Sequence, residues 1–181
     1  IGVVLSDAGF SEYLTIKDLL PILEALYPVF DKERFCNYCE RFSLPMDKKV
    51  REFSTGMKAK LKVLTAICNR DARLLILDEP TAGLDVMVRE EILDLLREFM
   101  IPGDRSILIS SHISSDLEHL CDDIYVIHKG KIVLHEEMDT ILEKYAMLKV
   151  SEEQYQDMFR YFTQKYPDKI QASIGYSEER A

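Results

Sequence analysis

The sequence has 181 residues, enough for one domain with a sizeable core or for one domain with a small appendage. Its 32 acidic and 23 basic residues give a net charge of −9, and such a field would repel a nucleic acid, so no nucleic-acid partner is expected. The longest apolar runs, such as 74–77, are far shorter than the roughly 20 residues that cross a bilayer. A role at a membrane would therefore need a partner.

The cysteines give one weak metal signal. Cys36 and Cys39 are spaced as metal ligands often are, but no second cysteine pair or suitably spaced histidine pair accompanies them. The sequence also opens without a positively charged leader ahead of an apolar stretch, so it shows no secretion signal. We expect reduced thiols in a cytosolic protein.

The first part of the chain has the pattern of a short strand followed by helices. Residues 1–5 form an apolar run with β-branched residues that ends in a polar turn, which predicts a strand. Thr15 is placed to cap a helix whose third residue is Asp18, and Asp31 is placed to cap a second helix. Residues 12–69 are therefore expected to form a helical subdomain.

The following part alternates short apolar strands with amphipathic helices, which predicts a parallel α/β sheet. Strands are expected at 74–77 and 106–110, on either side of a helix with one apolar stripe. Two further strands, at 123–128 and 131–135, flank a tight turn, and a helix is expected at 139–145.

Two carboxylates directly follow the strand at 74–77. Open parallel sheets bind ligands at the carboxyl ends of their strands, so Asp78 and Glu79 should project into a crevice. Asp78 could hold Mg²⁺ through its water shell, and Glu79 could accept a proton from a water that attacks a terminal phosphate. The alternative is that both residues only cap the following turn.

The residues after this pair favour phosphate chemistry. Together with the strand, the run 80–85, Pro-Thr-Ala-Gly-Leu-Asp, resembles the Walker B motif and D-loop of ABC ATPases. The resemblance implies ATP as the ligand, Asp78 at the Mg²⁺ ion and Glu79 as the catalytic base. It also implies that Asp85 contributes to an interface shared by two nucleotide-binding subunits.

A second motif opens a helix 24 residues before the first carboxylate. The segment 53–57, Phe-Ser-Thr-Gly-Met, resembles the ABC signature loop, whose usual form is Leu-Ser-Gly-Gly-Gln; its Thr and Met are similar to those of exporter-type cassettes. A helix N-terminus carries unpaired amides and partial positive charge, which suits a phosphate. The resemblance implies ATP contacts from Ser54, Thr55, Gly56 and Met57.

Three lysines follow the signature-like segment on the same expected helix: Lys58, Lys60 and Lys62. They are poorly placed for the dipole of their own helix but well placed for a nearby anion. A solvated basic face is the equally weighted alternative.

His112 lies 33 residues after Glu79, about the length of one strand-helix-strand unit. Because such a unit places the carboxyl ends of neighbouring strands side by side, His112 should face the crevice of Glu79. It resembles the switch histidine of ABC ATPases, which implies a hydrogen bond to the terminal phosphate. The alternative is a histidine that caps a helix beginning near Ser114. No comparable motif accompanies the other histidines, which are expected to lie at the surface or to serve only in packing: His119, His128 and His135.

Ser6 follows the first strand, where ABC ATPases carry a glutamine. A serine hydroxyl could still reach a metal-bound water, but the usual amide is replaced. This departure bears on how nucleotide binding is coupled to the helical subdomain.

The resemblance covers about residues 1–145 and implies a P-loop NTPase-like parallel α/β sheet with an inserted ABC helical subdomain. The role of the extension, 146–181, is unknown. The Gly-x-x-x-x-Gly-Lys phosphate loop of the family, Walker A, does not occur in the 181 residues and is expected to precede Ile1, so the domain is N-terminally incomplete. We therefore expect negligible ATP binding and no activity from this chain alone.

For the intact protein, the resemblance implies an ATP-hydrolysing subunit of a membrane transporter, with exporter type favoured. Its partners would be a second nucleotide-binding subunit, packed head to tail, and transmembrane permease subunits at the cytoplasmic face. Phe10, Tyr13 and Leu14 are candidates for the permease contact. Two alternatives stay open: an ABC ATPase without transport function, of translation-factor or DNA-repair type, and a degenerate cassette that does not hydrolyse ATP.

Overall fold

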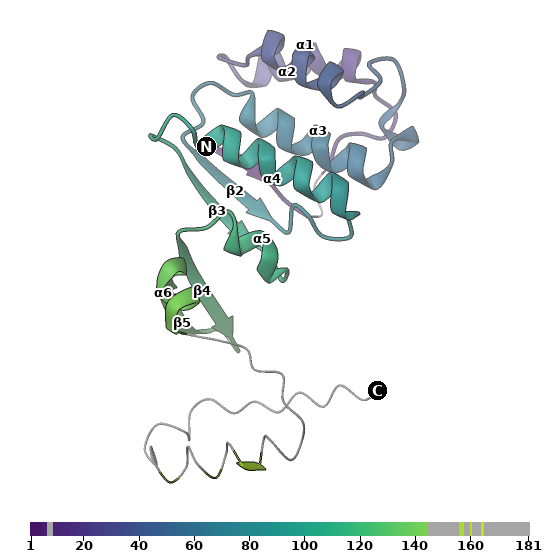
Figure 1. Cartoon of the computed structure of the whole chain (residues 1–181). Helices are drawn as coiled ribbons and strands as arrows, with labels where there is room; N and C mark the ends of the chain where they lie inside the picture. Colours follow the sequence, from purple (N-terminus) through teal and green to yellow (C-terminus); the bar gives the residue numbers. More distant parts are fainter. Residues whose placement is uncertain (7–8, 145–155, 158–159, 161–163, 165–181) are drawn as a thin grey trace. The chain divides into compact units, whose positions relative to one another are not determined.

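The computed structural model describes residues 1–6, 9–144, 156–157, 160 and 164, and Figure 1 traces them. The chain divides into two compact units, Ile1–Met138 and Asp139–Ala181. The predicted extension, 146–181, for which no role is assigned, lies outside the described residues apart from 156–157, 160 and 164.

The helical part of the first unit begins after the short strand β1 (Gly2–Val4) and contains α1 (Ile16–Leu26) and α2 (Lys32–Arg41). Thr15 and Asp18 form the predicted capping box of α1: the Thr15 Oγ1 accepts from the amide of Asp18 at 3.2 Å, and the Thr15 amide donates to the Asp18 carboxylate at 2.9 Å. Asp31 caps α2 through the amide of Arg34. The short 3₁₀ helix η1 (Val50–Glu52) then leads to α3 (Thr55–Ile67).

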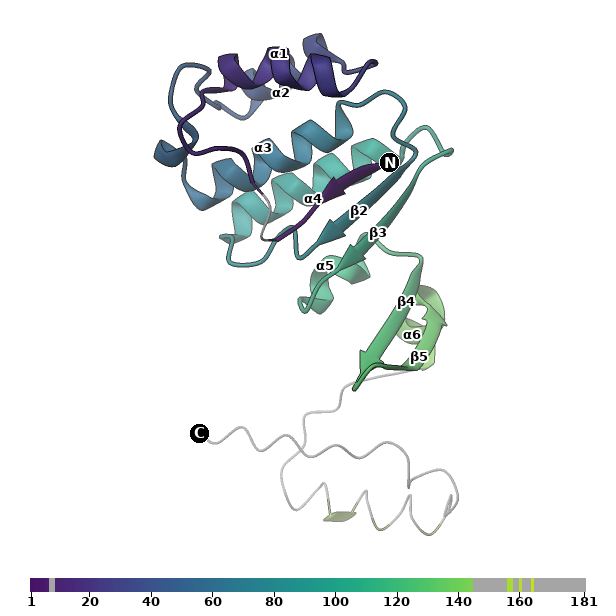
Figure 2. The ribbon, with the colours of Figure 1, turned by 180° about the vertical axis from the view of Figure 1, so that it is seen from behind.

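Three parallel strands form the sheet in the order β1, β2 (Leu74–Asp78) and β3 (Ser106–Ser110). The helix α4 (Val86–Met100) connects β2 to β3, as expected of a right-handed crossover unit. In Figure 1, α3 and α4 lie in front of the strands, and in Figure 2, seen from behind, the strands lie in front of these helices. The predicted parallel α/β sheet is thus confirmed.

Beyond β3 the first unit contains α5 (Ser114–Glu118), β4 (Asp123–His128) and β5 (Lys131–Glu137). The last two strands pair antiparallel as predicted, and both residues of their turn, Lys129 and Gly130, have positive φ angles of 48° and 73°. The helix α6 (Met138–Lys144) follows, starting one residue earlier than predicted. In the part of the chain that the structure describes, no helix combines the length and apolar character needed to cross a membrane.

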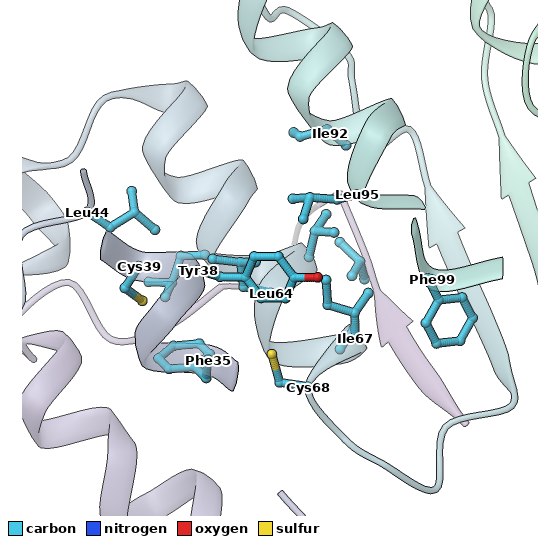
Figure 3. Packing of buried hydrophobic residues seen from close by; sticks show 14 of the residues in the cluster. Phe35, Tyr38, Cys39, Leu44, Leu64, Ile67, Cys68, Ile92, Leu95 and Phe99 are labelled. Atoms are coloured by element: carbon cyan, nitrogen blue, oxygen red, sulfur yellow. The ribbon is translucent and has the colours of Figure 1, made fainter. Parts of the chain in front are cut away.

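A continuous core joins the helical part to the sheet. Figure 3 shows buried side chains of this core from three helices, among them Tyr38 of α2, Leu64 of α3 and Leu95 of α4. Burial raises the pKa of Cys39 and of Cys68, both in this core, to about 12, so these thiols stay protonated near neutral pH.

The sheet face away from α3 and α4 carries exposed apolar side chains. Register places Val3, Ile76 and Leu108 side by side on this face. Val3 is 53% exposed and Leu108 is 60% exposed, whereas Gly2 and Val4 on the opposite face are buried. A parallel sheet is normally covered on both faces, so this surface is unusual.

Candidate functional site

Asp78, the last residue of β2, lies between two hydroxyl groups from the neighbouring strands. The Ser110 hydroxyl at the end of β3 donates to one carboxylate oxygen at 2.7 Å, and the Ser6 hydroxyl beyond β1 donates to the other at 2.8 Å. The bond from Ser110 has the larger effect and the bond from Ser6 the next, and together they lower the pKa of the Asp78 carboxyl below its ordinary value. These bonds therefore favour the ionised form of the Asp78 carboxyl at the carboxyl end of the sheet.

Glu79 and His112 contact each other directly, and Figure 1 shows the adjacent strands β2 and β3 from whose ends they come. The His112 Nδ1 lies 2.8 Å from a carboxylate oxygen of Glu79. The backbone of Glu79 has a left-handed φ of 48°, and its amide donates to the Ser110 carbonyl at 3.1 Å. The structure thus brings together the two residues predicted to be catalytic.

The capping alternatives fit this geometry less well. Both oxygens of Asp78 accept bonds from side chains on neighbouring strands, and the Glu79 carboxylate faces His112. The helix α5 has Ile113, not His112, at its N-cap position, without a side-chain cap bond. Asp78 therefore faces the two serine hydroxyls, and Glu79 faces His112.

The signature-like residues lie at the N-terminus of α3. The Ser54 hydroxyl caps the helix by accepting from the amide of Met57 at 3.2 Å, and Thr55 is its first residue. Gly56 is buried against α4, where an added Cβ would lie 2.9 Å from a methyl carbon of Val88. The Asp85 carboxylate accepts from the amide of this same Val88, so the signature-like segment and Asp85 are neighbours.

A cleft of about 370 Å³ lies between the strand ends and α3. Asp78 and Glu79 line it on one side, and Thr55, Lys58 and Lys62 line it on the other. Ser6 also lines this cleft, whereas His112, Ser54, Gly56, Met57 and Asp85 are not among its lining residues.

The three lysines of α3 each have partners within the chain. The Lys58 ammonium pairs with Glu12 at 3.2 Å. Lys60 is buried, pairs with Glu91 at 2.5 Å and lies over the Phe42 ring. The Lys62 ammonium donates to the backbone carbonyls of Leu5 and Ser6 at 3.3 and 3.1 Å. The solvated basic face is therefore wrong for Lys60, which is buried, whereas Lys58 and Lys62 are partly exposed and Lys62 also holds the backbone at Ser6.

Sequence reasoning gave no role to two residues of this region. Ser110 bonds Asp78, and the βαβ register that places Asp78 beside Ser110 was the signal that could have identified it. Asp116 of α5 is buried and bonds Thr81, two residues after Glu79. No sequence signal identified Asp116, because the five residues of α5 are too few to show which side of the helix faces inward.

The family model described as "AAA domain, putative AbiEii toxin, Type IV TA system" matches residues 12–115, more than half of the chain. The chain belongs to this family of AAA-type domains. Its relatives include the ABC transporter ATP-binding protein YtrB of Bacillus subtilis, 34% identical over 142 residues, which are 78% of this chain and 48% of YtrB. The bacitracin transport ATP-binding protein BcrA of Bacillus licheniformis is 35% identical over 135 residues, 74% of this chain and 44% of BcrA.

A solved structure described as the ATP-binding subunit of an ABC transporter superposes on this AAA-type chain with a TM-score of 0.68. Its sequence is 24% identical, and the match covers 87% of this chain and 68% of that one. This likeness supports the fold, and the curated relatives confirm the resemblance to ABC transporter ATP-binding proteins. The chain spans about half the length of the curated relatives it matches.

Proposed function

We propose that the whole protein binds and hydrolyses ATP as a subunit of an ABC membrane transporter, and that this chain carries the hydrolytic residues. The observation that carries the proposal is the convergence of Asp78, Glu79 and His112 at the ends of β2 and β3, with His112 and Glu79 only 2.8 Å apart. Ligands of open parallel sheets bind at this edge.

Asp78 and Ser6 are the proposed metal residues. Mg²⁺ prefers oxygen ligands and keeps several waters, and the ionised Asp78 carboxylate with the Ser6 hydroxyl beside it supplies oxygen atoms only. When bound there, Mg²⁺ would neutralise charge on the phosphates of ATP. Ser6 stands where the family glutamine is expected, so in this chain a hydroxyl would contact Asp78 in its place.

Glu79 and His112 are the proposed catalytic pair. The Glu79 carboxylate would accept a proton from the attacking water, as a general base does. With a proton on each ring nitrogen, His112 would donate from Nδ1 to this carboxylate, 2.8 Å away, and from Nε2 to the terminal phosphate. His112 is largely exposed, with 69% of its side chain accessible, so it can meet a ligand from outside the sheet.

The signature-like residues and Asp85 are proposed to act on a second nucleotide-binding subunit in a head-to-tail dimer. Ser54 and Thr55 are exposed at the start of α3, a helix of 13 residues whose first amides point outward. These amides, with Gly56 and Met57 in the first turn, would contact ATP held by the other subunit. The exposed N-terminus supports this role because an exposed helix start can reach a neighbouring molecule.

The membrane partner is proposed to be a permease at the cytoplasmic face. Tyr13 of the loop before α1 is 71% exposed, and Phe10 and Leu14 pack partly against the core beside it. Relatives named for the transport of bacitracin and lantibiotics and for the export of Nod factor support an exporter. The 181-residue chain alone is proposed to bind ATP negligibly, because it contains no Walker A sequence.

The test is steady-state ATP hydrolysis by the whole protein with Glu79→Gln. We expect hydrolysis to fall by about 100-fold or more, because the amide cannot accept the proton. Glu118→Gln, an equal change of charge on the exposed side of α5, is the matched control and should keep the wild-type rate. Equal, measurable rates for Glu79→Gln and wild type would remove Glu79 from this role, whereas no hydrolysis by either protein would support the degenerate, non-hydrolysing cassette.

A further inference from the structure

Asp116 is a buried carboxylate in an otherwise accessible helix. Asp116 is only 1% exposed, whereas Ser114, Ser115 and Glu118 of the same helix, α5, are exposed. The Thr81 hydroxyl, itself fully buried, donates to one Asp116 oxygen at 2.7 Å. A buried charge is costly unless it is paired and hydrogen-bonded, so these contacts are a requirement for α5 to dock as it does.

The Thr81–Asp116 bond joins the same two segments as the Glu79–His112 contact. Thr81 follows Glu79 by two residues, and Asp116 follows His112 by four. The Glu79–His112 contact is accessible, with side-chain exposures of 69% for His112 and 29% for Glu79, so water competes with it. The Thr81–Asp116 bond is shielded from water and is therefore the better suited to hold the segments at a fixed separation.

Arg89 of α4 supplies the second partner of Asp116. Its Nε lies 3.4 Å from the other Asp116 oxygen, and among the described residues this buried nitrogen has no hydrogen-bond partner. The Asp116 carboxylate is therefore the ion-pair partner of the Arg89 guanidinium. Arg89 lies one turn after Asp85, the N-cap of α4. The Asp116 carboxylate therefore joins α5 both to α4, through Arg89, and to the segment after β2, through Thr81.

The Glu79 backbone needs such support. A left-handed φ of 48° in a residue other than glycine costs free energy and persists only where the surrounding structure imposes it. We propose that Asp116 is a positioning residue that, through Thr81 and Arg89, holds Glu79 and His112 in register for hydrolysis. This inference rests on the proposed ATP hydrolysis by the whole protein.

The experiment measures kcat and KM for ATP hydrolysis by the whole protein carrying Thr81→Val, Thr81→Ser or Asp116→Asn. Valine keeps the buried volume of Thr81 but loses the donor, and serine keeps the donor. We expect kcat to fall about tenfold or more for Thr81→Val and Asp116→Asn, with KM within about twofold, because a small displacement of a catalytic group slows the reaction strongly. Thr81→Ser and the control Glu118→Gln should stay near wild type.

Two outcomes would overturn the positioning role. One is a wild-type kcat for Thr81→Val in the folded protein. The other is a matching loss in Thr81→Ser and Thr81→Val, which would assign the effect to packing. Circular dichroism checks folding, and if Asp116→Asn fails to fold, the two Thr81 variants decide alone. If Glu79→Gln also keeps the wild-type rate, the proposed function itself fails. If only Glu79→Gln loses activity, the proposed function stands and the positioning role of Asp116 fails.

Discussion

Two serines donate to the oxygen atoms of Asp78, Ser110 at the end of β3 and Ser6 beyond the end of β1. Each bond spans a large separation along the sequence, 72 residues from Ser6 and 32 from Ser110. Hydroxyl groups that bond a metal ligand orient it, and their loss commonly weakens metal binding or activity by about 10- to 100-fold. At the proposed Mg²⁺ site, Ser6 would therefore act in part by orienting the Asp78 carboxylate.

We predict that Ser110→Ala raises the Mg²⁺ concentration needed for half-maximal ATP hydrolysis by the whole protein by about tenfold. A Mg²⁺ titration of the hydrolysis rate measures this shift. Ser115→Ala, which removes an exposed hydroxyl from α5, is the matched control. An unchanged titration for Ser110→Ala would mean that Asp78 does not depend on this bond to meet the metal.

At the scale of elements, helix starts are governed by single capping residues. Asp31 caps α2 and also accepts a 2.9 Å bond from Arg70. The Arg70 bond, followed by the Arg34 amide bond, lowers the pKa of the Asp31 carboxyl below its ordinary value. A carboxyl with a lowered folded pKa stabilises the fold above its unfolded pKa, and that contribution is lost as the pH falls through the folded pKa.

We predict that Asp31→Ala lowers the free energy of unfolding by about 1 to 2 kcal/mol at pH 7. Urea unfolding at pH 7 and at pH 3 measures the difference from wild type. This difference should shrink at pH 3, which lies below the ordinary pKa of the carboxyl, because the unfolded chain takes up a proton at Asp31 before the folded chain does. Asp31→Asn keeps a capping oxygen and should lose less. A difference that grows toward pH 3 would contradict the assigned charge.

Local features of this fold follow from the sequence, and distant ones do not. The Thr15 and Asp31 caps were predictable because each bond spans three residues, and the strand-helix-strand rule placed His112 near Glu79. The bond between Thr81 and Asp116 spans 35 residues, and no periodicity specifies which polar side chain enters the core there. The burial of Lys60 could likewise not be predicted, because its ion-pair partner Glu91 comes from another helix.

At the scale of the molecule, the apolar sheet face sets how this chain behaves in solution. Val3 and Leu108 lie on the same face, one on each side of β2, and are each more than half exposed. Contiguous exposed apolar surface promotes association, and the edges of a short sheet add unpaired backbone groups.

We predict that the 181-residue chain, expressed alone, binds an apolar fluorescent dye and self-associates at micromolar concentrations. The double variant Val3→Thr and Leu108→Thr keeps strand-compatible side chains and should reduce both effects. Sedimentation velocity and dye fluorescence measure them, and Ser106→Thr, a change at an already polar position of β3, is the matched control. A monomeric wild-type chain without dye binding would show that this face is covered.

The most direct test of the account asks which nucleotide remains bound after the whole protein is incubated with MgATP. If Glu79, held at 2.8 Å from His112, acts in the hydrolysis step, the Glu79→Gln protein should retain ATP while the wild type yields ADP. ADP formed by Glu79→Gln at the wild-type rate would contradict the account, because the bound nucleotide would then be cleaved without the carboxylate.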